Sequence, residues 1–192
     1  NAGAASSSWA TIFGEGLSST SRAWSSADIV NGKLPESLDG VSVKINNKPA
    51  SVYYVSPKQI NVQAPDDTTN GSVQVTVTNA NGTSDPLTST IANVQPGFFL
   101  LQSEYIAAVR PDGSYVAPEG LIDGLATTPA RPGEVVSIFG TGFGPANPAL
   151  PAGTIVEAPE PLLNTVKINV DTTQVDVQYA GITSAGLYQF NI

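Results

Sequence analysis

The sequence predicts an all-β protein made of two tandem Ig-like β-sandwich domains, the second of which lacks its last strands. Three observations predict this fold class. Apolar and polar residues alternate in short β-prone segments. Turn signals separate these segments at the spacing typical of β-sandwiches. One set of segments also occurs twice in the same order, and 192 residues are long enough for two ordinary domains.

Four pairs of matching segments make up the repeat. The second member of each pair lies 123 to 130 residues after the first, and loops accommodate such small differences in offset because they tolerate insertions. The pairs are residues 9–17 and 135–143, 43–46 and 166–169, 52–54 and 177–179, and 58–62 and 188–192. We therefore expect two copies of one β-domain.

The second copy is shorter than the first. After Val62 the first copy continues through further strand signals to Val94, whereas the second copy stops at Ile192, the counterpart of Val62. Residues 1–97 and 98–192 are therefore predicted to be two Ig-like domains, the second C-terminally incomplete.

Strand and turn signals fill the first domain. Residues 1–8 are small and polar and are predicted to be a lead-in with weak structure of its own. In a Ser-rich excursion over residues 17–39, residues 21–30 are the one place where we expect a short helix. The expected strands are residues 9–13, 41–45, 51–55, 59–63, 73–77 and 87–94, with turns at Asn46-Asn47-Lys48-Pro49 and Asn81-Gly82.

The second domain begins after a Gln-Pro-Gly boundary at residues 95–97. Its first residues, Phe98, Phe99, Leu100 and Leu101, form the most apolar cluster of the chain. We expect this cluster to pack at the interdomain junction or against another subunit, because apolar patches on soluble proteins are usually covered. The strands expected next are residues 106–110, 114–117, 134–139, 166–170, 174–179 and 187–192.

The composition argues against several classes of function. The 8 Lys and Arg residues form no cluster and are outnumbered by 16 Asp and Glu, giving a net charge of −8. We therefore expect no nucleic-acid binding and no attraction to anionic membranes. No apolar run approaches the ~18 residues of a membrane span, so we expect no membrane insertion. The chain has no Cys, His or Met, which excludes disulfides, thiolate catalysis and a Ser-His-Asp triad, and we expect it to be a processed or excised segment.

The segment Gly-Thr-Gly-Phe-Gly at residues 140–144 follows a predicted strand, as a dinucleotide-binding loop would. Its third glycine comes one position too early for G-x-G-x-x-G. In addition, Pro145 and Pro148 preclude the helix whose N-terminus would hold the phosphate. A turn or bulge that ends the strand is the favoured interpretation.

Carboxylates are the remaining candidates for catalysis or metal binding. A glycosidase needs two of them facing each other, but most lie in predicted turns and none lies in an apolar run that would raise its pKa. The candidates are Glu15, Glu36, Asp66, Asp67, Glu104 and Glu119, with Asp112 and Asp123 as additional calcium candidates. No D-x-D-x-D-G loop is present, so we expect no catalytic residues, no cofactor and no metal.

Aromatic residues are candidates for stacking on sugars. They are Trp9, Trp24, Tyr53, Tyr54, Tyr105 and Tyr115. Trp9 lies in a predicted strand and is aligned with Val135, so we expect it to be buried. Trp24 and Tyr115 lie in excursions and are the two candidates for a surface site.

Several segments together carry a resemblance. They are residues 12–14, 34–35, 38–43, 54–57 and 59–65 of the first copy and residues 132–133, 138–142 and 186–191 of the second. This combination resembles the uncharacterised C-terminal repeat domain family of large secreted acidobacterial proteins. The resemblance implies an Ig-like fold and an extracytoplasmic location, and it implies no catalytic residues. Two departures are Ser-Ser-Ser at residues 6–8, where the family has Pro-Gly, and the missing strands after Ile192.

An incomplete sandwich predicts a role in assembly, because open strand edges recruit strands. The expected acceptor edge is Leu187, Tyr188, Gln189, Phe190, Asn191 and Ile192. A strand from a copy of the same chain would complete the domain by donor-strand complementation. The alternative is that the missing remainder of its own chain completes it. The chain is thus interpreted as a non-enzymatic bacterial structural module, extracellular or on the cell surface, that forms a filament or surface polymer. The alternative is a carbohydrate-binding or adhesion module of a larger secreted protein, with polysaccharide as its partner.

Overall fold

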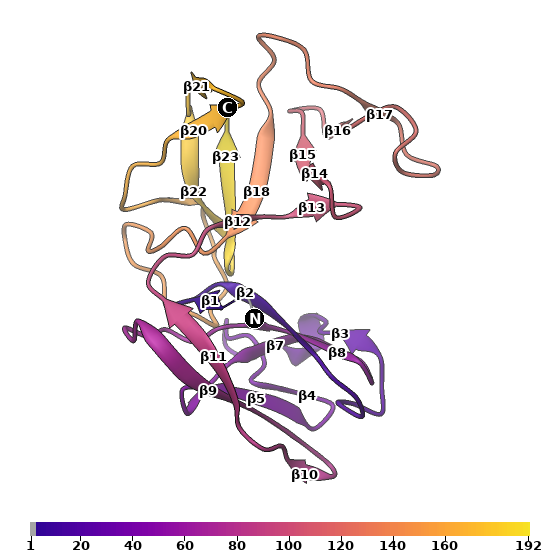
Figure 1. The fold of residues 1–192 in the computed structure, drawn as a ribbon, viewed down its shortest axis with the longest axis vertical. Helices are drawn as coiled ribbons and strands as arrows, with labels where there is room; N and C mark the ends of the chain where they lie inside the picture. The colour runs from indigo at the N-terminus through magenta and orange to yellow at the C-terminus, as the bar shows by residue number, and fades with distance from the viewer. Residues whose placement is uncertain (1–2) are drawn as a thin grey trace.

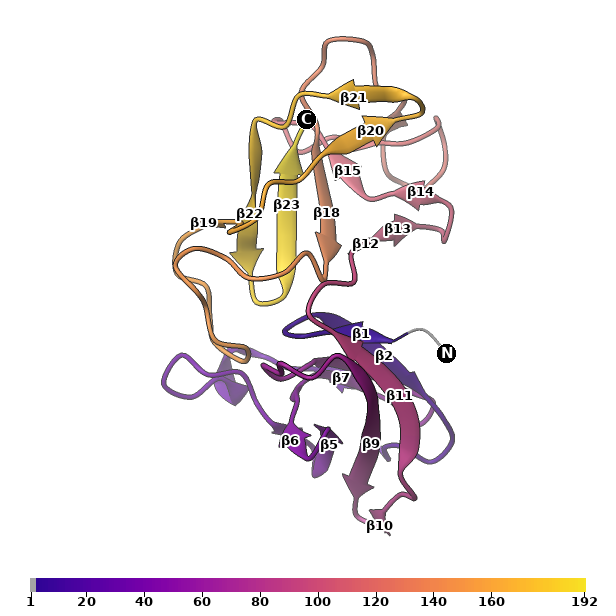
Figure 2. The ribbon, with the colours of Figure 1, turned by 60° about the vertical axis from the view of Figure 1, so that its left-hand side comes forward.

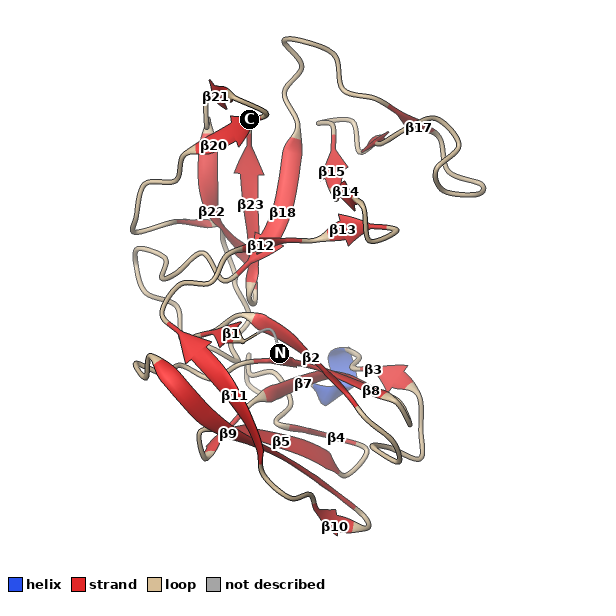
Figure 3. Cartoon of the chain, viewed as in Figure 1, coloured by secondary structure: helices blue, strands red, loops and turns tan. Residues whose placement is uncertain are grey.

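The computed structural model describes residues 3–192, which are almost entirely strand, turn and loop with one 3₁₀ turn (Figure 3). The strands gather in two lobes along the long axis of the molecule (Figure 1). The strands of residues 4–92 form one lobe, and those of residues 97–191 form the other. Each lobe has its own cluster of buried apolar side chains.

The first lobe is a sandwich of two sheets. One sheet has the order β1-β11-β9-β5-β4, with β10 on β9 and β6 on β5, and the other has the order β2-β8-β7-β3. The strands are β1 Ala4–Ala5, β2 Trp9–Phe13, β3 Arg22–Ala23, β4 Ser37–Leu38, β5 Val41–Ile45, β6 Lys48–Pro49, β7 Ser51–Val55, β8 Gln59–Gln63, β9 Gly71–Asn79, β10 Gly82–Thr83 and β11 Leu87–Ala92. Alternate side chains of each strand point into the space between the sheets, so Val43 of β5 and Val52 of β7 are fully buried there.

The structure tests two expectations for this lobe. The N-terminal segment was expected to lack structure of its own, but Ala4 and Ala5 form β1, which pairs in parallel with Ile91 and Ala92 of β11. The prediction of weak structure is wrong for this part because small residues fit beside a neighbouring strand, and Asn1 and Ala2 lie outside the described residues. The short helix expected within residues 21–30 is confirmed only in part: this range contains the three-residue 3₁₀ turn η1, Ser26–Asp28, while Arg22–Ala23 form the strand β3.

The second lobe has one large sheet and two small hairpins. The sheet has the order β17-β16-β15-β18-β23-β22-β19, with β12 also pairing with β18, and the hairpins are β13-β14 and β20-β21. The strands are β12 Gly97–Phe98, β13 Leu100–Leu101, β14 Tyr105–Ile106, β15 Ala108–Val109, β16 Tyr115–Val116, β17 Thr127–Thr128, β18 Ser137–Thr141, β19 Glu160–Pro161, β20 Ile168–Val170, β21 Thr173–Val175, β22 Tyr179–Ser184 and β23 Leu187–Asn191. Phe190 is the fully buried centre of its core, with ring centroids 4.4 Å from Phe143 and 5.8 Å from Phe98.

The repeat seen in the sequence is also a repeat of strand register. In the first lobe β2 pairs with β8 and β8 with β7, and in the second lobe β18 pairs with β23 and β23 with β22. The matching partners are Ile12↔Ile60 and Ile138↔Phe190, Thr11↔Asn61 and Ser137↔Asn191, and Tyr54↔Asn61 and Tyr179↔Asn191. Side chains repeat as well, because Gln59 Nε2 donates to Asn61 Oδ1 at 2.8 Å and Gln189 Nε2 donates to Asn191 Oδ1 at 2.9 Å.

A long loop of the second lobe holds the two lobes together. This loop, residues 145–159 between β18 and β19, reaches down onto the first lobe (Figure 2). The Gly153 N–H donates to Gln63 Oε1 at 2.9 Å, and the Gly153 carbonyl accepts from the Leu34 N–H at 2.8 Å. The Ala152 N–H donates to Asp66 Oδ2 at 2.9 Å. Bonds on both sides of the loop tip fix it against the first lobe.

Candidate functional site

The main structural difference between the two copies lies at β20. In the first lobe, β5 has β9 along one edge, with Val43↔Val77, Lys44↔Thr76 and Ile45↔Val75 as partners. The other edge of β5 carries β4 and the hairpin strand β6. Its counterpart β20 pairs, among the described strands, only with its own hairpin partner β21. β21 follows β20 in the chain as β6 follows β5. The edge of β20 that faces away from β21 therefore corresponds to the edge of β5 that pairs with β9, and no described strand pairs with it.

The backbone of Asn169 faces this open edge. Val170 and Thr173 close a two-residue hairpin loop, and the closing pair of such a hairpin exchanges hydrogen bonds. By alternation, the N–H and C=O of Asn169 point away from β21. The counterpart of Asn169 in the repeat is Asn46, whose N–H donates to the Gln74 carbonyl of β9 at 2.9 Å.

A groove of 490 Å³ lies beside this edge. Val166 and Ile168 line it on the β20 side, and Phe98 and Phe143 line it on the other. Its remaining lining residues are Val94, Pro96, Gly97, Asn164, Thr165, Lys167 and Asn169. The groove therefore combines apolar lining residues with the outward-facing backbone groups of Asn169.

Residues at matching positions are less buried in the second copy. Val43 is 1% exposed, whereas its counterpart Val166 is half-buried. Val52 is 0% exposed, whereas its counterpart Val177 is half-buried. β9 and β11 cover the first core, and the second core has no equivalent cover among the described strands. An unpaired edge next to incompletely buried apolar side chains is the arrangement that accepts an added β-strand.

The acceptor edge expected at residues 187–192 is wrong. β23 lies between β18 and β22 and pairs with both, so its backbone groups are already used. Its position at the end of the sequence suggested an edge. However, the strands that follow Val62 in the first copy, β9 and β11, belong to the other sheet. In the second lobe no described strand takes the place of β9 and β11, so the edge of β20 is open, whereas β23 is central.

The four residues of the cluster at the start of the second lobe have different environments. Phe98 packs inside the second core, with its ring centroid 5.3 Å from that of Phe143. Phe99 lines a pocket at the junction with the first lobe. Leu100 is 51% exposed and pairs with Ile106, while Leu101 pairs with Tyr105 in the same hairpin.

Asp67 differs from the solvated turn carboxylate that was expected. Its side chain is 2% exposed and lies 3.5 Å from Lys48 Nζ. Burial would raise its pKa, but hydrogen bonds from the Thr69 backbone N–H and the Asn46 amide, at 2.8 and 2.9 Å, together with Lys48, lower the pKa to about 2. Asp67 therefore stays ionised and fixes the loop before β9.

The structure groups no three His, Cys, Asp or Glu side chains as a metal site within residues 3–192. The same residues contain no helix with the length and apolar character needed to cross a membrane. β18 ends at Thr141, as the sequence indicated, and Gly142 follows it with φ +79°. A Cβ at Gly142 would meet the carbonyl of Gln95, and the N–H of Gln95 donates to the Gly142 carbonyl at 2.9 Å. This glycine segment therefore packs against Gln95, between β11 and β12.

A cavity of 560 Å³ lies against the loop that joins the lobes. Its most polar groups already have partners. Asp66 accepts from the Ser7 hydroxyl and the Ala152 N–H, and the Tyr188 hydroxyl donates to the Gly144 carbonyl. Burial raises the pKa of Tyr188 to about 12, so this hydroxyl stays protonated. The cavity is explained by packing between the lobes.

Three of the aromatic candidates meet in one cluster. Ring centroids are 5.9 Å apart for Trp9 and Trp24, 5.5 Å for Trp9 and Tyr53, and 4.9 Å for Trp24 and Tyr53. Trp9 is half-buried, and its Nε1 donates to the Ala185 carbonyl of the second lobe at 2.9 Å. Tyr115, the other expected surface aromatic, is a half-buried residue of β16 and lies outside this cluster.

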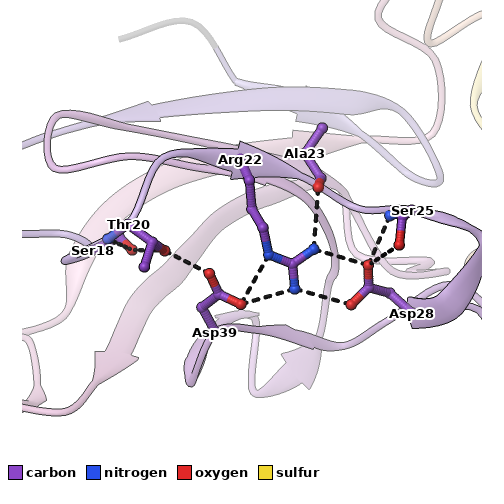
Figure 4. A network of polar contacts seen from close by, with 7 residues as sticks. All are labelled: Ser18, Thr20, Arg22, Ala23, Ser25, Asp28 and Asp39. Atoms are coloured by element: carbon purple, nitrogen blue, oxygen red, sulfur yellow. Dashed lines mark hydrogen bonds and ion pairs between the residues drawn. The ribbon is translucent and has the colours of Figure 1, made fainter.

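An ion-pair network orders the excursion that carries Trp24 (Figure 4). Arg22 donates to both carboxylate oxygens of Asp28 at 2.9 and 3.0 Å and to Asp39 at 2.8 Å. The hydrogen bonds from Arg22 are the main reason that the pKa values of Asp28 and Asp39 lie below their usual range. Thr20 also donates to Asp39. The network closes residues 18–39 into a fixed loop, which the sequence pattern did not reveal.

The two-sheet sandwich of the first lobe defines an all-β, Ig-like protein. Residues 6–91 match the IPT/TIG domain family. This segment runs from just before β2 into β11 and so covers the sandwich except for β1 and the last residue of β11. The match supports an Ig-like family, whose modules are generally non-catalytic and often occur in adhesion, extracellular or signalling proteins, but it does not identify the acidobacterial repeat family. No curated protein and no solved structure matches the chain significantly.

Proposed function

We propose that the chain is a non-enzymatic structural module that assembles by accepting a β-strand along the open edge of β20. In this proposal residues 1–97 and 98–192 are two Ig-like domains, and the strand is supplied by a neighbouring molecule, which extends the assembly into a filament or surface polymer. The module acts outside the cell or on the bacterial surface, as the resemblance to secreted repeat proteins implies. The observation that carries the proposal is the free β20 edge beside the groove of 490 Å³, where the first copy has β9.

The first copy supports a definite kind of strand. β9 is antiparallel to β5 and places Val77 opposite Val43 and Val75 opposite Ile45, with Thr76 between them opposite Lys44. The β20 region repeats the acceptor side of this pattern with Val166, Lys167 and Ile168. The incoming strand would therefore run antiparallel to β20, with β-branched residues facing the groove and polar residues facing solvent.

The test uses a peptide with the sequence of β9, residues 71–79, and a scrambled peptide of the same composition. We expect the β9 peptide to bind the chain and the scrambled peptide not to bind, as measured by fluorescence anisotropy of labelled peptide. Asn169→Pro should abolish binding, because proline removes the N–H that points to the open edge.

Gln174→Pro is the matched control. Gln174 lies directly opposite Asn169 in the same hairpin, and its N–H points to the other side of that hairpin. This variant should bind the peptide as the parent chain does. Equal loss in both variants, or no binding of the β9 peptide to the parent chain, would contradict the proposal.

The source of the strand is tested separately by light scattering over a range of protein concentrations. A strand from a neighbouring molecule predicts a mass that rises with concentration and falls when excess β9 peptide is added. The alternative source is tested with a chain that is extended at its C-terminus. If this longer chain keeps a constant monomer mass and its β20 edge is protected from hydrogen exchange, the strand comes from the same polypeptide.

A further inference from the structure

A second site lies at the junction of the two lobes. It is a pocket of 370 Å³ whose aromatic wall is formed by Trp9, Trp24 and Tyr53 of the first lobe. The second lobe contributes Phe99 and the turn between β22 and β23. The remaining lining residues are Ala10, Thr11, Asn61, Ser184, Ala185 and Leu187. The volume falls within the ~300–1,000 Å³ range of small-molecule sites.

Several polar groups in this pocket lack a partner among the described residues. Asn61 Oδ1 accepts from Gln59 Nε2, which orients the amide and leaves Asn61 Nδ2 without a protein acceptor. Thr11 and Ser184 are exposed residues of the lining, and their hydroxyls are accessible to a ligand. The pocket therefore offers free amide and hydroxyl groups beside aromatic rings.

The chemistry of the wall limits the class of ligand. No charged side chain lines the pocket, so it has nothing to neutralise a phosphate, a carboxylate or a cation. Aromatic surface next to uncharged donors and acceptors matches a molecule that is apolar on one face and carries hydroxyl groups around its edge. A pyranose ring has this character.

We propose that this pocket binds a neutral saccharide, with Trp24 and Tyr53 contacting the sugar ring and Asn61 donating to a sugar hydroxyl. The site is independent of the β20 edge and goes beyond the proposed assembly function. A module with both features would join to its neighbours at β20 and hold a glycan at the interlobe junction.

Arg22 acts as a positioning residue for this site. β3, Arg22–Ala23, pairs with Val55 and Tyr54 of β7, and the next residue, Trp24, donates its N–H to the Tyr53 carbonyl at 2.8 Å. The Arg22 network therefore fixes the backbone immediately before Trp24 (Figure 4).

The experiment measures tryptophan fluorescence during titration with cellohexaose, laminarihexaose, xylohexaose and chitohexaose. Both tryptophans of the chain line the pocket, so their emission reports on it directly. We expect at least one oligosaccharide to shift the emission in a saturable manner and, in calorimetry, Trp24→Ala and Asn61→Asp each to weaken its binding about tenfold or more.

Two variants keep the result interpretable. Asn61→Asp keeps the oxygen that accepts from Gln59 and replaces the donor group by a second, negatively charged acceptor oxygen, so it decides the outcome if Trp24→Ala fails to fold. Tyr115→Ala, an aromatic outside the pocket, should bind as the parent chain does. The proposal is overturned if none of the four oligosaccharides binds at up to about 10 mM, or if Asn61→Asp binds with unchanged affinity.

Discussion

Truncating the same valine in the two copies should have unequal effects on stability. Val43 and Val166 occupy matching positions, but Val43 is 1% exposed under β9 while Val166 is half-buried beside the groove. Replacing valine by alanine removes two carbon atoms, at about 0.8 kcal/mol for each buried methylene equivalent, and leaves a cavity where the site cannot collapse. Val43→Ala should therefore cost about 2 kcal/mol. Val166→Ala should cost about 0.5–1 kcal/mol, because solvent already reaches the groove side.

The assay is thermal unfolding followed by circular dichroism, supported by urea titration. For a chain of this size, about 2 kcal/mol lowers the Tm by about 4–8 °C, and about 0.5–1 kcal/mol lowers it by about 1–4 °C. Adding the β9 peptide should increase the cost of Val166→Ala, because the groove is then covered, and leave that of Val43→Ala unchanged. Equal costs for the two variants without peptide would refute the reasoning, since they would mean that both valines are equally enclosed.

Three further outcomes are expected. The ionised Asp67 stabilises the fold above its unfolded pKa of 3.8, and this contribution, about 2 kcal/mol, should be lost as the pH falls through about 2. Melting curves between pH 5 and pH 2 should therefore show a smaller fall of the Tm in Asp67→Asn than in the parent chain. An equal fall of the Tm in both would exclude Asp67 as its source. Gly153→Val should release the interlobe loop, because Gly153 has φ +73° and a Cβ would approach Ser51 Oγ within 2.7 Å. Faster hydrogen exchange at the Leu34 amide would show the release, and unchanged exchange would argue against it. Arg22→Gln should accelerate exchange in residues 18–39 and leave β18 and β23 protected, whereas uniform acceleration would mean global destabilisation.

The sequence predicted the duplicated strands because register and burial follow from local patterns. Ile12 and Ile138 were aligned from sequence, and they pair with Ile60 and Phe190 at equivalent places in their sheets. This succeeds because β-strand alternation and short turns are encoded by neighbouring residues.

The location of the open edge could not be predicted in the same way. Residues 187–192 have a clear strand pattern, but the pattern does not specify which strands lie on either side. That depends on pairing between segments distant in sequence. The first copy contained the missing information, because β9, which follows Val62, pairs with β5 and not with β8. Comparing the pairing of the two copies would have placed the edge at β20.

Long-range contacts also determine the features that the sequence did not reveal. In the sequence, Asp67 is one of the candidate carboxylates that lie outside apolar runs, so no local pattern indicates its burial. Its side chain is buried by contacts with Asn46 and Lys48, which belong to a hairpin distant from Asp67 in the sequence. Likewise, Trp9 and Trp24 converge only because β2 and the residues after β3 meet at the junction of the lobes.

Hydrogen exchange at Asn169, measured by NMR beside its counterpart Asn46, tests the open edge most directly. In the isolated monomeric chain we expect the Asn46 amide to be protected by its bond to Gln74 and the Asn169 amide to exchange rapidly. Adding the residue 71–79 peptide should then protect Asn169 without changing Asn46. An Asn169 amide that is already as protected as Asn46 in the monomer, or that stays unprotected with saturating peptide, would contradict the assignment of β20 as a strand acceptor.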